Sequence, residues 1–341
     1  MSLLTNDMGN NSTKKKITRG IDSDFAEAFK KCELYELYEN HKDELIIGVR
    51  NDYLNLYYNC DSIAKIEYKK TEKKIVCEIN KYYLDGKHYT GYTVKEKRIR
   101  IEPSQIIEQY ETIKANSDKK ATLEKKAQSK LVLLNNENQE SKWFCIDIEY
   151  VKQFNDMAEK KEANLNGRFD IIALSKEKPH RTALIELKYG SGAIGGKCGI
   201  YKHISDFSEF CRKGFFESHL KQEIINIVKS QIALGVEVPF ELPEISTLLS
   251  EPEFYFITLD NNPEKTGASA PKQTMAGYLF KEKRWDCKRL STIQCVENDF
   301  GDVTKKDNPF HATFLFSTAT LDNLGISDII EGQYDERIIP E

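Results

Sequence analysis

The sequence predicts an α/β protein, α+β overall, in which a mixed central sheet flanked by helices follows an N-terminal region rich in antiparallel strands. Three observations predict this fold. The length of 341 residues exceeds that of a typical single domain. Short runs of β-branched and aromatic residues crowd residues 44–84. Three apolar runs between residues 143 and 189 are followed by a stretch with helical periodicity and then by a fourth apolar run at 253–260. This order is typical of a sheet packed between helices.

Composition and charge limit the classes of protein to which the chain can belong. Hydrophobic residues make up 40% and charged residues 30% of the sequence, which is typical of a globular protein with a large core. The formal net charge of −4 counts against a passive nucleic-acid coat protein, because such proteins carry a net positive charge. It does not count against an enzyme in which an acidic metal site lies beside a local basic groove.

The eight cysteines indicate a reducing compartment, and we therefore expect a cytoplasmic protein. None forms a Cys-x-x-Cys pair, and no group of Cys and His residues has zinc-finger spacing. Cys77 and Cys145 stand inside apolar runs, where cysteine behaves as a small hydrophobic residue. The sequence shows no signal peptide and no apolar run long enough to span a membrane, so no membrane partner is predicted.

Changes of pattern divide the chain into three parts. Residues 1–20 are polar, include three consecutive lysines, and are predicted to form a flexible arm. Residues 21–117 are predicted to form an N-terminal α+β region that binds a substrate or a partner. Residues 118–341 are predicted to form the second domain, which contains the candidate site described below.

The N-terminal region is predicted to begin with a helix and to continue as an antiparallel meander. Phe25, Phe29, Leu34 and Leu37 recur at helical spacing and predict a helix over 25–38. The runs ELIIGVR, YLNLYYN, SIAKIEYK and KIVCEINKYYL are then separated by turn-forming residues, a pattern typical of paired strands. The tyrosines that are frequent in this region could stack on bases, or they could simply occupy a half-buried sheet surface.

Capping residues and periodicity also predict the elements that follow. Pro103 suits the first turn of a helix, and Asp118 is predicted to cap the next one. The predicted elements are helices at 103–116 and 118–134, strands at 143–151, 167–174 and 182–189, helices at 200–213 and 217–234, and strands at 253–260 and 312–316. A glycine-rich turn over 190–199 separates the third of these strands from the helix after it.

The two strands around Asp170 and Glu186 are predicted to form a hairpin, because the polar, proline-containing segment SKEKPHR lies between them. A ladder in which Leu174 faces Thr182 places Asp170 directly opposite Glu186. Directly opposed side chains have Cβ atoms roughly 4.5–5.5 Å apart. The hairpin therefore predicts a close pair of carboxylates.

A close pair of carboxylates on apolar strands needs compensation, because like charges repel more strongly away from bulk water. A shared proton, a divalent cation or the flanking cations could supply it. The same register places those cations, Arg168 and Lys188, opposite each other, and strand alternation puts Lys188 on the face of Glu186. Hard oxygen ligands suit Mg²⁺ or Mn²⁺, so the pair predicts a site for one of these ions. A surface ladder of charges is the alternative interpretation.

Asp170, a gap and then Glu186-Leu187-Lys188 at the end of the next strand resemble the motif of the PD-(D/E)xK nuclease superfamily, which has the restriction-endonuclease-like fold. The order helix, three strands, helix, strand over roughly residues 119–260 is similar to that superfamily as well. The residue before Asp170 is Phe169 rather than proline, and the resemblance leaves the N-terminal region unexplained.

The resemblance implies a role for each residue of the motif. Asp170 and Glu186 would bind Mg²⁺ or Mn²⁺ together with the backbone carbonyl of Leu187. Lys188 would orient or deprotonate the attacking water and stabilise negative charge in the transition state. A further acidic ligand often comes from the preceding helix, where Glu124 lies. Glu149, near the end of its strand, is nevertheless the preferred further ligand.

Phosphate contacts are expected after the catalytic strand. The glycine-rich turn exposes backbone amides that can approach a phosphate closely. In the resembling superfamily the helix that follows commonly supplies polar residues to the site. The predicted phosphate-binding or nucleic-acid-binding residues are Lys197, Lys202, His203 and Arg168. For Lys202 and His203 the alternative is an ordinary solvated start of a helix.

The resemblance implies a metal-dependent nuclease that hydrolyses phosphodiester bonds in DNA, ahead of RNA, by metal-activated water. An endonuclease of the restriction, defence or repair type is expected because the superfamily contains many, and a homodimer is expected because many such nucleases pair to cut both strands. The alternative is a nucleic-acid-binding or protein-binding module on a nuclease-like fold, without turnover. A non-nuclease metal hydrolase is disfavoured by the lack of clustered histidines.

Overall fold

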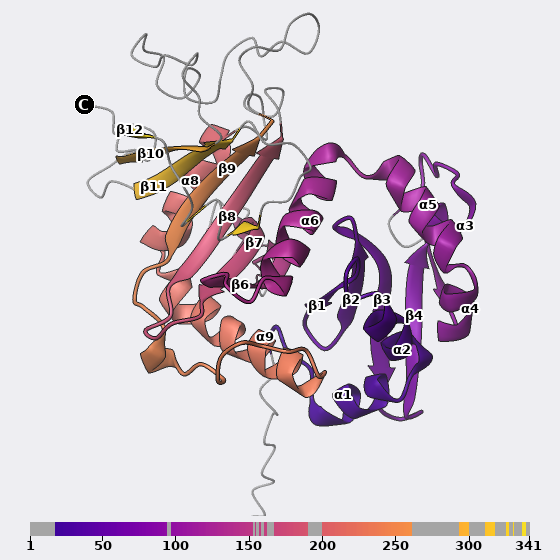
Figure 1. Cartoon of the computed structure of the whole chain (residues 1–341). Coiled ribbons are helices and arrows are strands. Elements are labelled where there is room, and N and C mark those ends of the chain that lie inside the picture. The colour runs from indigo at the N-terminus through magenta and orange to yellow at the C-terminus, as the bar shows by residue number, and fades with distance from the viewer. Residues whose placement is uncertain are drawn as a thin grey trace, which may run out of the picture.

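Two sheets organise the fold (Figure 1). The computed structural model describes residues 18–93, 97–152, 154, 157, 160–161, 167–189, 200–260, 293–299, 311–317, 325–326, 330 and 336–338. Within these residues a five-stranded sheet precedes a seven-stranded sheet, and helices accompany both. The mixed α+β architecture predicted from the sequence is confirmed at this level.

The first sheet is an antiparallel meander in the order β1-β2-β3-β4-β5. Its strands are β1 (Ile46–Val49), β2 (Leu54–Tyr58), β3 (Asp61–Lys69), β4 (Lys74–Asn80) and β5 (Arg98–Ile101). The helices of this region are α1 (Ser23–Lys30), α2 (Glu33–Asn40), α3 (Lys81–Asp85), α4 (Pro103–Glu108) and α5 (Tyr110–Lys120). Buried residues alternate along β4, because one face of the strand lies on the core and the other faces outward.

Several predicted boundaries in this region are wrong. The single helix predicted over 25–38 is two helices, and the run KYYL is not a strand but helix α3. Asn80 caps α3 by accepting from the Tyr82 N–H, and Gly86 ends it with a φ of 70°, a conformation that favours glycine. The tyrosines in KYYL have high strand propensity, but these two capping residues favour a helix, and the caps prevail.

The second sheet is mixed, in the order β12-β10-β11-β9-β8-β7-β6. Its strands are β6 (Trp143–Val151), β7 (Arg168–Ser175), β8 (Thr182–Tyr189), β9 (Glu253–Leu259), β10 (Ile293–Asp299), β11 (His311–Ser317) and β12 (Glu336–Ile338). The first three strands are antiparallel neighbours, whereas β8 and β9 run parallel. The predicted sequence of helix, three strands, helix and strand is present in this order.

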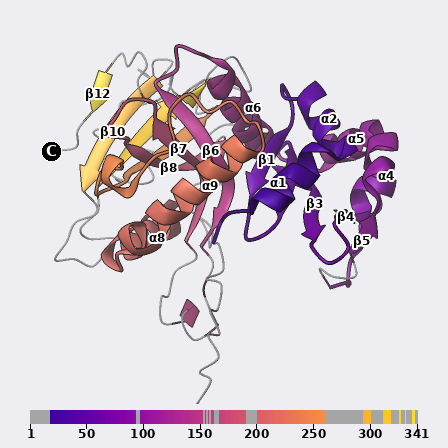
Figure 2. The same cartoon turned by 90° about the horizontal axis from the view of Figure 1, so that it is seen from below.

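Helices cover both faces of β6 to β9, as Figure 2 shows from below. On one face lies α6 (Leu123–Glu137); on the other lie α8 (Ile200–Arg212), a π-helical turn at Phe216–Leu220, and α9 (Lys221–Ala233). Leu187 belongs to the apolar cluster that α6 completes, whereas Leu184 belongs to the cluster that α8 and α9 complete. This alternation directs the side chains of Glu186 and Lys188 toward α8. Helix α6 begins after Thr122, which caps it in place of the predicted Asp118.

A buried ion cluster joins the two sheets. The carboxylate of Asp147 on β6 accepts from Arg50, at the end of β1, over 2.6 Å and from Arg19 over 3.3 Å. The Asp147 side chain has no exposed surface, and those of Arg19 and Arg50 are 2% and 6% exposed. Residues 18–20, which were predicted to belong to the flexible arm, therefore include part of the folded core. Residues 1–17 lie outside the described residues.

The outer edge of β6 is capped by side chains instead of a further strand. The contacts are Asn135 Nδ2 to Trp143 O (2.9 Å), Asn136 Nδ2 to Cys145 O (2.9 Å), Gln231 Nε2 to Ile146 O (2.9 Å), Arg50 Nη2 to Ile148 O (2.6 Å) and Arg19 Nη2 to Val151 O (2.6 Å). An edge strand presents backbone groups that could pair with another chain. Here α6, α9 and the first sheet satisfy them.

The chain passes from one sheet to the other through α5 and α6. The domain boundary predicted between residues 117 and 118 falls inside α5, which continues to Lys120. In both cartoon views α6 lies between the two sheets (Figures 1 and 2). None of the helices in the described ranges is both long and apolar enough to cross a membrane.

Substitution of Asp147 by Asn is expected to destabilise the protein by about 3–5 kcal/mol, because two buried guanidinium groups lose their countercharge. Urea denaturation measures the difference in the free energy of unfolding. The control is Glu27→Gln, which removes a surface pair with Lys30 and is expected to leave the unfolding midpoint unchanged. A midpoint for Asp147→Asn equal to that of the wild type would show that this cluster does not hold the sheets together.

Candidate functional site

The hairpin of β7 and β8 has the predicted register. Ile171 pairs with Ile185, and the ladder continues to Leu174 opposite Thr182. Asp170 lies one residue beyond this ladder. There its side-chain oxygen Oδ2, in place of a backbone oxygen, accepts a hydrogen bond from the Leu187 N–H over 2.8 Å. Asp170 therefore lies against the Glu186-Leu187-Lys188 segment, as the motif requires.

Glu186 and Lys188 form a buried ion pair on the face of β8 that α8 covers. Their residues are 2% and 6% exposed. Lys188 Nζ lies 2.5 Å from Glu186 Oε1, and His203 Nε2, on α8, lies 3.0 Å from the same oxygen. Burial alone would raise the pKa of Glu186, but the hydrogen bond with His203 and the charge of Lys188 bring it below the usual value.

The pKa of Asp170 is shifted in the opposite direction. Burial raises it well above the usual value for an aspartate, and the negative charge of Glu186 raises it further. The charge of Lys188 and the Leu187 N–H oppose this shift without cancelling it. The carboxylate pair is therefore compensated in two ways at once: Glu186 is ionised beside two basic groups, and Asp170 holds a proton more tightly.

Helix α6 brings two more polar groups to the site. Glu124 Oε1 lies 4.0 Å from Lys188 Nζ, and Gln128 Nε2 donates to the backbone carbonyl of Asp170 over 2.7 Å. Burial raises the pKa of Glu124, against the charge of Lys188. The two residues are four apart on α6 and so share one helix face. Gln128 was not among the predicted site residues, although its spacing from Glu124 would have indicated it.

Glu149, the preferred fourth ligand in the sequence prediction, lies on β6 beside α6. Its φ of 51° is unusual for a glutamate, and the register between β6 and β7 shifts nearby, between Cys145 and Asp147. Burial raises the pKa of Glu149, while the charge of Lys125 and a hydrogen bond with Gln128 lower it. Glu124 therefore pairs with Lys188, whereas Glu149 interacts with Lys125 and Gln128, and its negative charge helps to raise the pKa of Asp170.

The predicted phosphate-binding residues differ in their positions. His203 enters the site through its contact with Glu186. Lys202 is directed instead to Asp206, one turn along α8, at 2.5 Å. Arg168 is exposed and pairs with Val151 on β6, and the β7–β8 ladder ends at Ile171 and Ile185 before it reaches Arg168 and Lys188. Lys197 and the glycine-rich turn lie outside the described residues.

The donor set fits a hard divalent cation in its chemistry. Asp170 and Glu186 are close enough for the charge of Glu186 to raise the pKa of Asp170. A divalent cation would neutralise the combined negative charge of the two carboxylates. In the part of the chain that the structure describes, however, no group of three or more His, Cys, Asp and Glu side chains is arranged around a common point. One oxygen of Glu186 already contacts Lys188 and His203. A cation that used this oxygen would compete with Lys188 and His203 for it.

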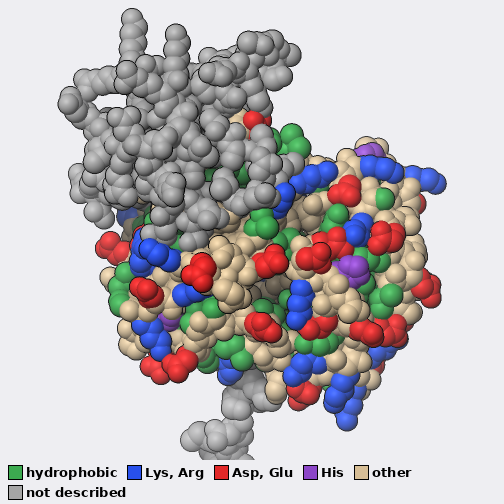
Figure 3. All heavy atoms as spheres, viewed as in Figure 1, with side chains coloured by type: hydrophobic (Ala, Val, Ile, Leu, Met, Phe, Trp, Pro, Cys, Tyr) green, Lys and Arg blue, Asp and Glu red, His purple; other side chains and the backbone are tan. Residues whose placement is uncertain are grey.

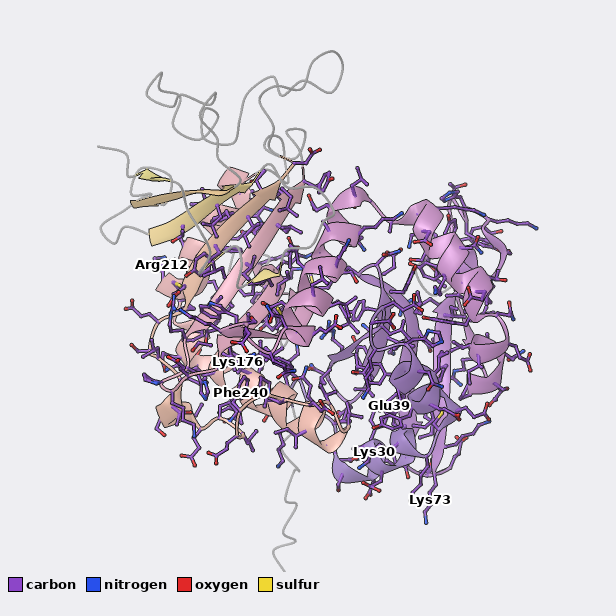
Figure 4. All side chains as sticks on the ribbon, in the orientation of Figure 1. Lys30, Glu39, Lys73, Lys176, Arg212 and Phe240 are labelled. Carbon is purple, nitrogen blue, oxygen red and sulfur yellow. The ribbon has the colours of Figure 1, made fainter. Side chains whose placement is uncertain are left out.

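A separate cavity of about 610 Å³ lies between the two sheets, lined by β1, β6, α6 and the segment after α9. Lys176 is one of its lining residues and is labelled in Figure 4. Neither Asp170 nor the Glu186–Lys188 pair lines it. The cavity therefore belongs to the junction of the sheets and not to the candidate site.

Comparison of the chain with protein-family models, with curated protein sequences and with solved structures finds no match. The chemistry of the site is therefore inferred from the contacts of its own side chains.

Asp170→Asn is expected to stabilise the protein near pH 8. Because the folded-state pKa of Asp170 is raised, the native state binds a proton there more tightly than the unfolded chain. The contribution of Asp170 to stability is therefore lost as the pH rises from about 4 through that raised pKa, and the asparagine variant lacks this particular loss. Urea denaturation across this pH range should show a difference that shrinks toward pH 4.

The matched control is Glu72→Gln, which alters an exposed acid in the turn between β3 and β4. Its stability should follow that of the wild type at every pH. A constant difference between Asp170→Asn and the wild type over the whole range would contradict the raised pKa.

Proposed function

We propose that the chain is a metal-dependent nuclease of the PD-(D/E)xK type, with a restriction-endonuclease-like fold in residues 118–341. The observation that supports this most directly is the contact of the Asp170 carboxylate with the Leu187 N–H, beside the buried Glu186–Lys188 pair. Two acids and a lysine on adjacent strands are the groups that metal-assisted phosphodiester hydrolysis needs. The proposed substrate is DNA, ahead of RNA.

Asp170, Glu186 and the carbonyl of Leu187 would hold Mg²⁺ or Mn²⁺. When bound, such an ion neutralises developing phosphate charge and lowers the pKa of a water molecule. Lys188 contributes a fixed positive charge. Burial lowers the pKa of Lys188, but the charges of Glu186 and Asp170 outweigh burial and raise it. A lysine held protonated is suited to orienting water and stabilising the transition state, rather than to removing a proton.

His203 and Glu124 contact the Glu186–Lys188 pair from helices on opposite faces of the sheet. His203 shares Glu186 Oε1 with Lys188 and so restrains the carboxylate from the side of α8. Glu124 approaches Lys188 from α6 and keeps its ammonium near the strand end. When such an ion is bound, Glu186 would be one of its ligands, and Lys188 would supply positive charge to the substrate. We further propose endonucleolytic cleavage, a homodimer that cuts both strands, and a cytoplasmic location.

A second candidate function is a binding module without turnover on the same fold. This function is favoured by the contacts of Glu186 with Lys188 and His203, because they balance its negative charge without a bound ion. A structural ion pair would need no cation. The two experiments below separate the candidates.

Asp170→Asn and Lys188→Met are each expected to lower DNA cleavage about 100-fold or more in Mg²⁺ or Mn²⁺, because each removes a group that acts on the developing charge. Cleavage of linear, circular and single-stranded DNA is followed on gels. Lys178→Met is the matched control, since Lys178 lies in the turn of the same hairpin and is 49% exposed. Cleavage that persists unchanged in both site variants would assign it to another protein in the preparation.

Mn²⁺ or Mg²⁺ is expected to stabilise the wild type by about 2.7 kcal/mol when its concentration is 100 times the dissociation constant. Asp170→Asn and Glu186→Gln should lose most of this stabilisation, whereas Glu72→Gln should retain it. Denaturation with and without the ion measures the effect in the absence of DNA. Equal stabilisation of all four proteins would show that Asp170 and Glu186 do not bind the ion. No stabilisation of the wild type would favour the binding module.

A further inference from the structure

Four lysines cluster where α5 ends and α6 begins. They are Lys119, Lys120, Lys125 and Lys126, and together they form what we call the lysine elbow. In Figure 3, lysine and arginine side chains lie along the upper right rim of the molecule, with acidic side chains among and below them. The chain as a whole carries a net charge of −4, so this concentration of positive charge is local.

A buried carboxylate beneath the surface holds two of these lysines in place. Lys125 Nζ lies 3.0 Å and Lys120 Nζ 3.7 Å from Asp61 Oδ1, at the start of β3. The Asp61 side chain is 4% exposed, whereas those of the two lysines are 36–37% exposed. The acid is thus withdrawn from solvent and the ammonium groups stay at the surface. An anion that approaches the elbow meets the positive groups first.

Tyr83 restrains Lys120 further. Lys120 Nζ lies 2.5 Å from the Tyr83 hydroxyl and 4.5 Å from the centre of the Tyr83 ring. A lysine held by a carboxylate, a hydroxyl and a ring loses less side-chain entropy on binding an anion than a lysine in solution. The elbow is therefore organised before any ligand arrives.

The elbow is continuous with the candidate site. Glu124, which contacts Lys188, directly precedes Lys125 in α6. Gln128, which donates to the Asp170 carbonyl, lies less than one helical turn beyond Lys125. Two consecutive turns of one helix therefore connect the basic surface with the carboxylates. The lysines at the start of α6 are therefore next in the chain to residues that contact the candidate site.

We propose that the lysine elbow binds the phosphate backbone of the nucleic-acid substrate and guides the strand to the candidate site. This inference rests on the proposed nuclease function and assigns part of its substrate surface. It also gives the first sheet a role, because β3 supplies Asp61 and α3 supplies Tyr83. Backbone binding of this kind is independent of base sequence and weakens as salt rises.

The test uses the full chain in EDTA, so that binding is measured without cleavage. Fluorescence anisotropy follows a labelled DNA oligonucleotide, single-stranded and as a duplex, over a range of salt concentrations. Lys119→Gln combined with Lys126→Gln should weaken binding. Each lost phosphate contact should reduce the slope of log affinity against log salt by about 0.9 for the duplex and about 0.7 for the single strand.

The control combines Lys30→Gln with Lys73→Gln, two lysines at the far end of the first sheet from the elbow (Figure 4). It removes the same charge and should leave the affinity and the salt slope unchanged. Equal losses in the two double variants would mean that overall charge alone governs binding, and this would overturn the proposal. Unchanged binding by the elbow variant would overturn it as well.

Failure of the elbow is distinguishable from failure of the nuclease. If the wild type cleaves DNA while the elbow variant binds and cleaves like it, the elbow proposal is wrong and the nuclease proposal stands. If the wild type binds DNA through the elbow but does not cleave it with Mg²⁺ or Mn²⁺, the elbow stands and the nuclease proposal is wrong.

Discussion

The placing of the half-buried Asp170 carboxylate beside the buried Glu186 carboxylate is the constraint on which the rest of the site depends. A sheet covered by helices on both faces offers little water to these charges, so other groups must compensate them. Lys188 and His203 do so for Glu186, and the Leu187 N–H does so in part for Asp170. Each contact comes from a different direction, which is why both α8 and the β7–β8 hairpin are needed to build the site.

These contacts also describe how the site could respond to a cation. Without an ion, the chain supplies its own positive charge to Glu186, while Asp170 favours its protonated form. Asp170 and Glu186 would hold a divalent cation, and its charge would stabilise the ionised form of each carboxylate. The raised pKa of Asp170 and the lysine contact of Glu186 are then two aspects of one electrostatic balance. The same balance accounts for a lysine that stays charged in a nearly buried position.

The first sheet is held to this site by charge as well as by apolar packing. Asp147 binds Arg19 and Arg50, and these two arginines also cap the edge of β6. On the other side of α6, Asp61 holds Lys125, whose charge acts on Glu149. The N-terminal region is therefore part of the surroundings of the site and not a separate module on a linker.

The sequence by itself determined the strands around the motif and the register of the β7–β8 hairpin. Both depend on local rules, namely the alternation of side chains along a strand and the short polar turn between the strands. The register is strongly specified, because a slip by one residue would move every side chain to the other face of the sheet. Only the tertiary structure decided that Glu124 contacts Lys188, that His203 contacts Glu186, that Lys202 pairs with Asp206, and that Arg19 is buried. The position and rotation of a helix on a sheet depend on packing among residues far apart in the chain, and no local pattern encodes them.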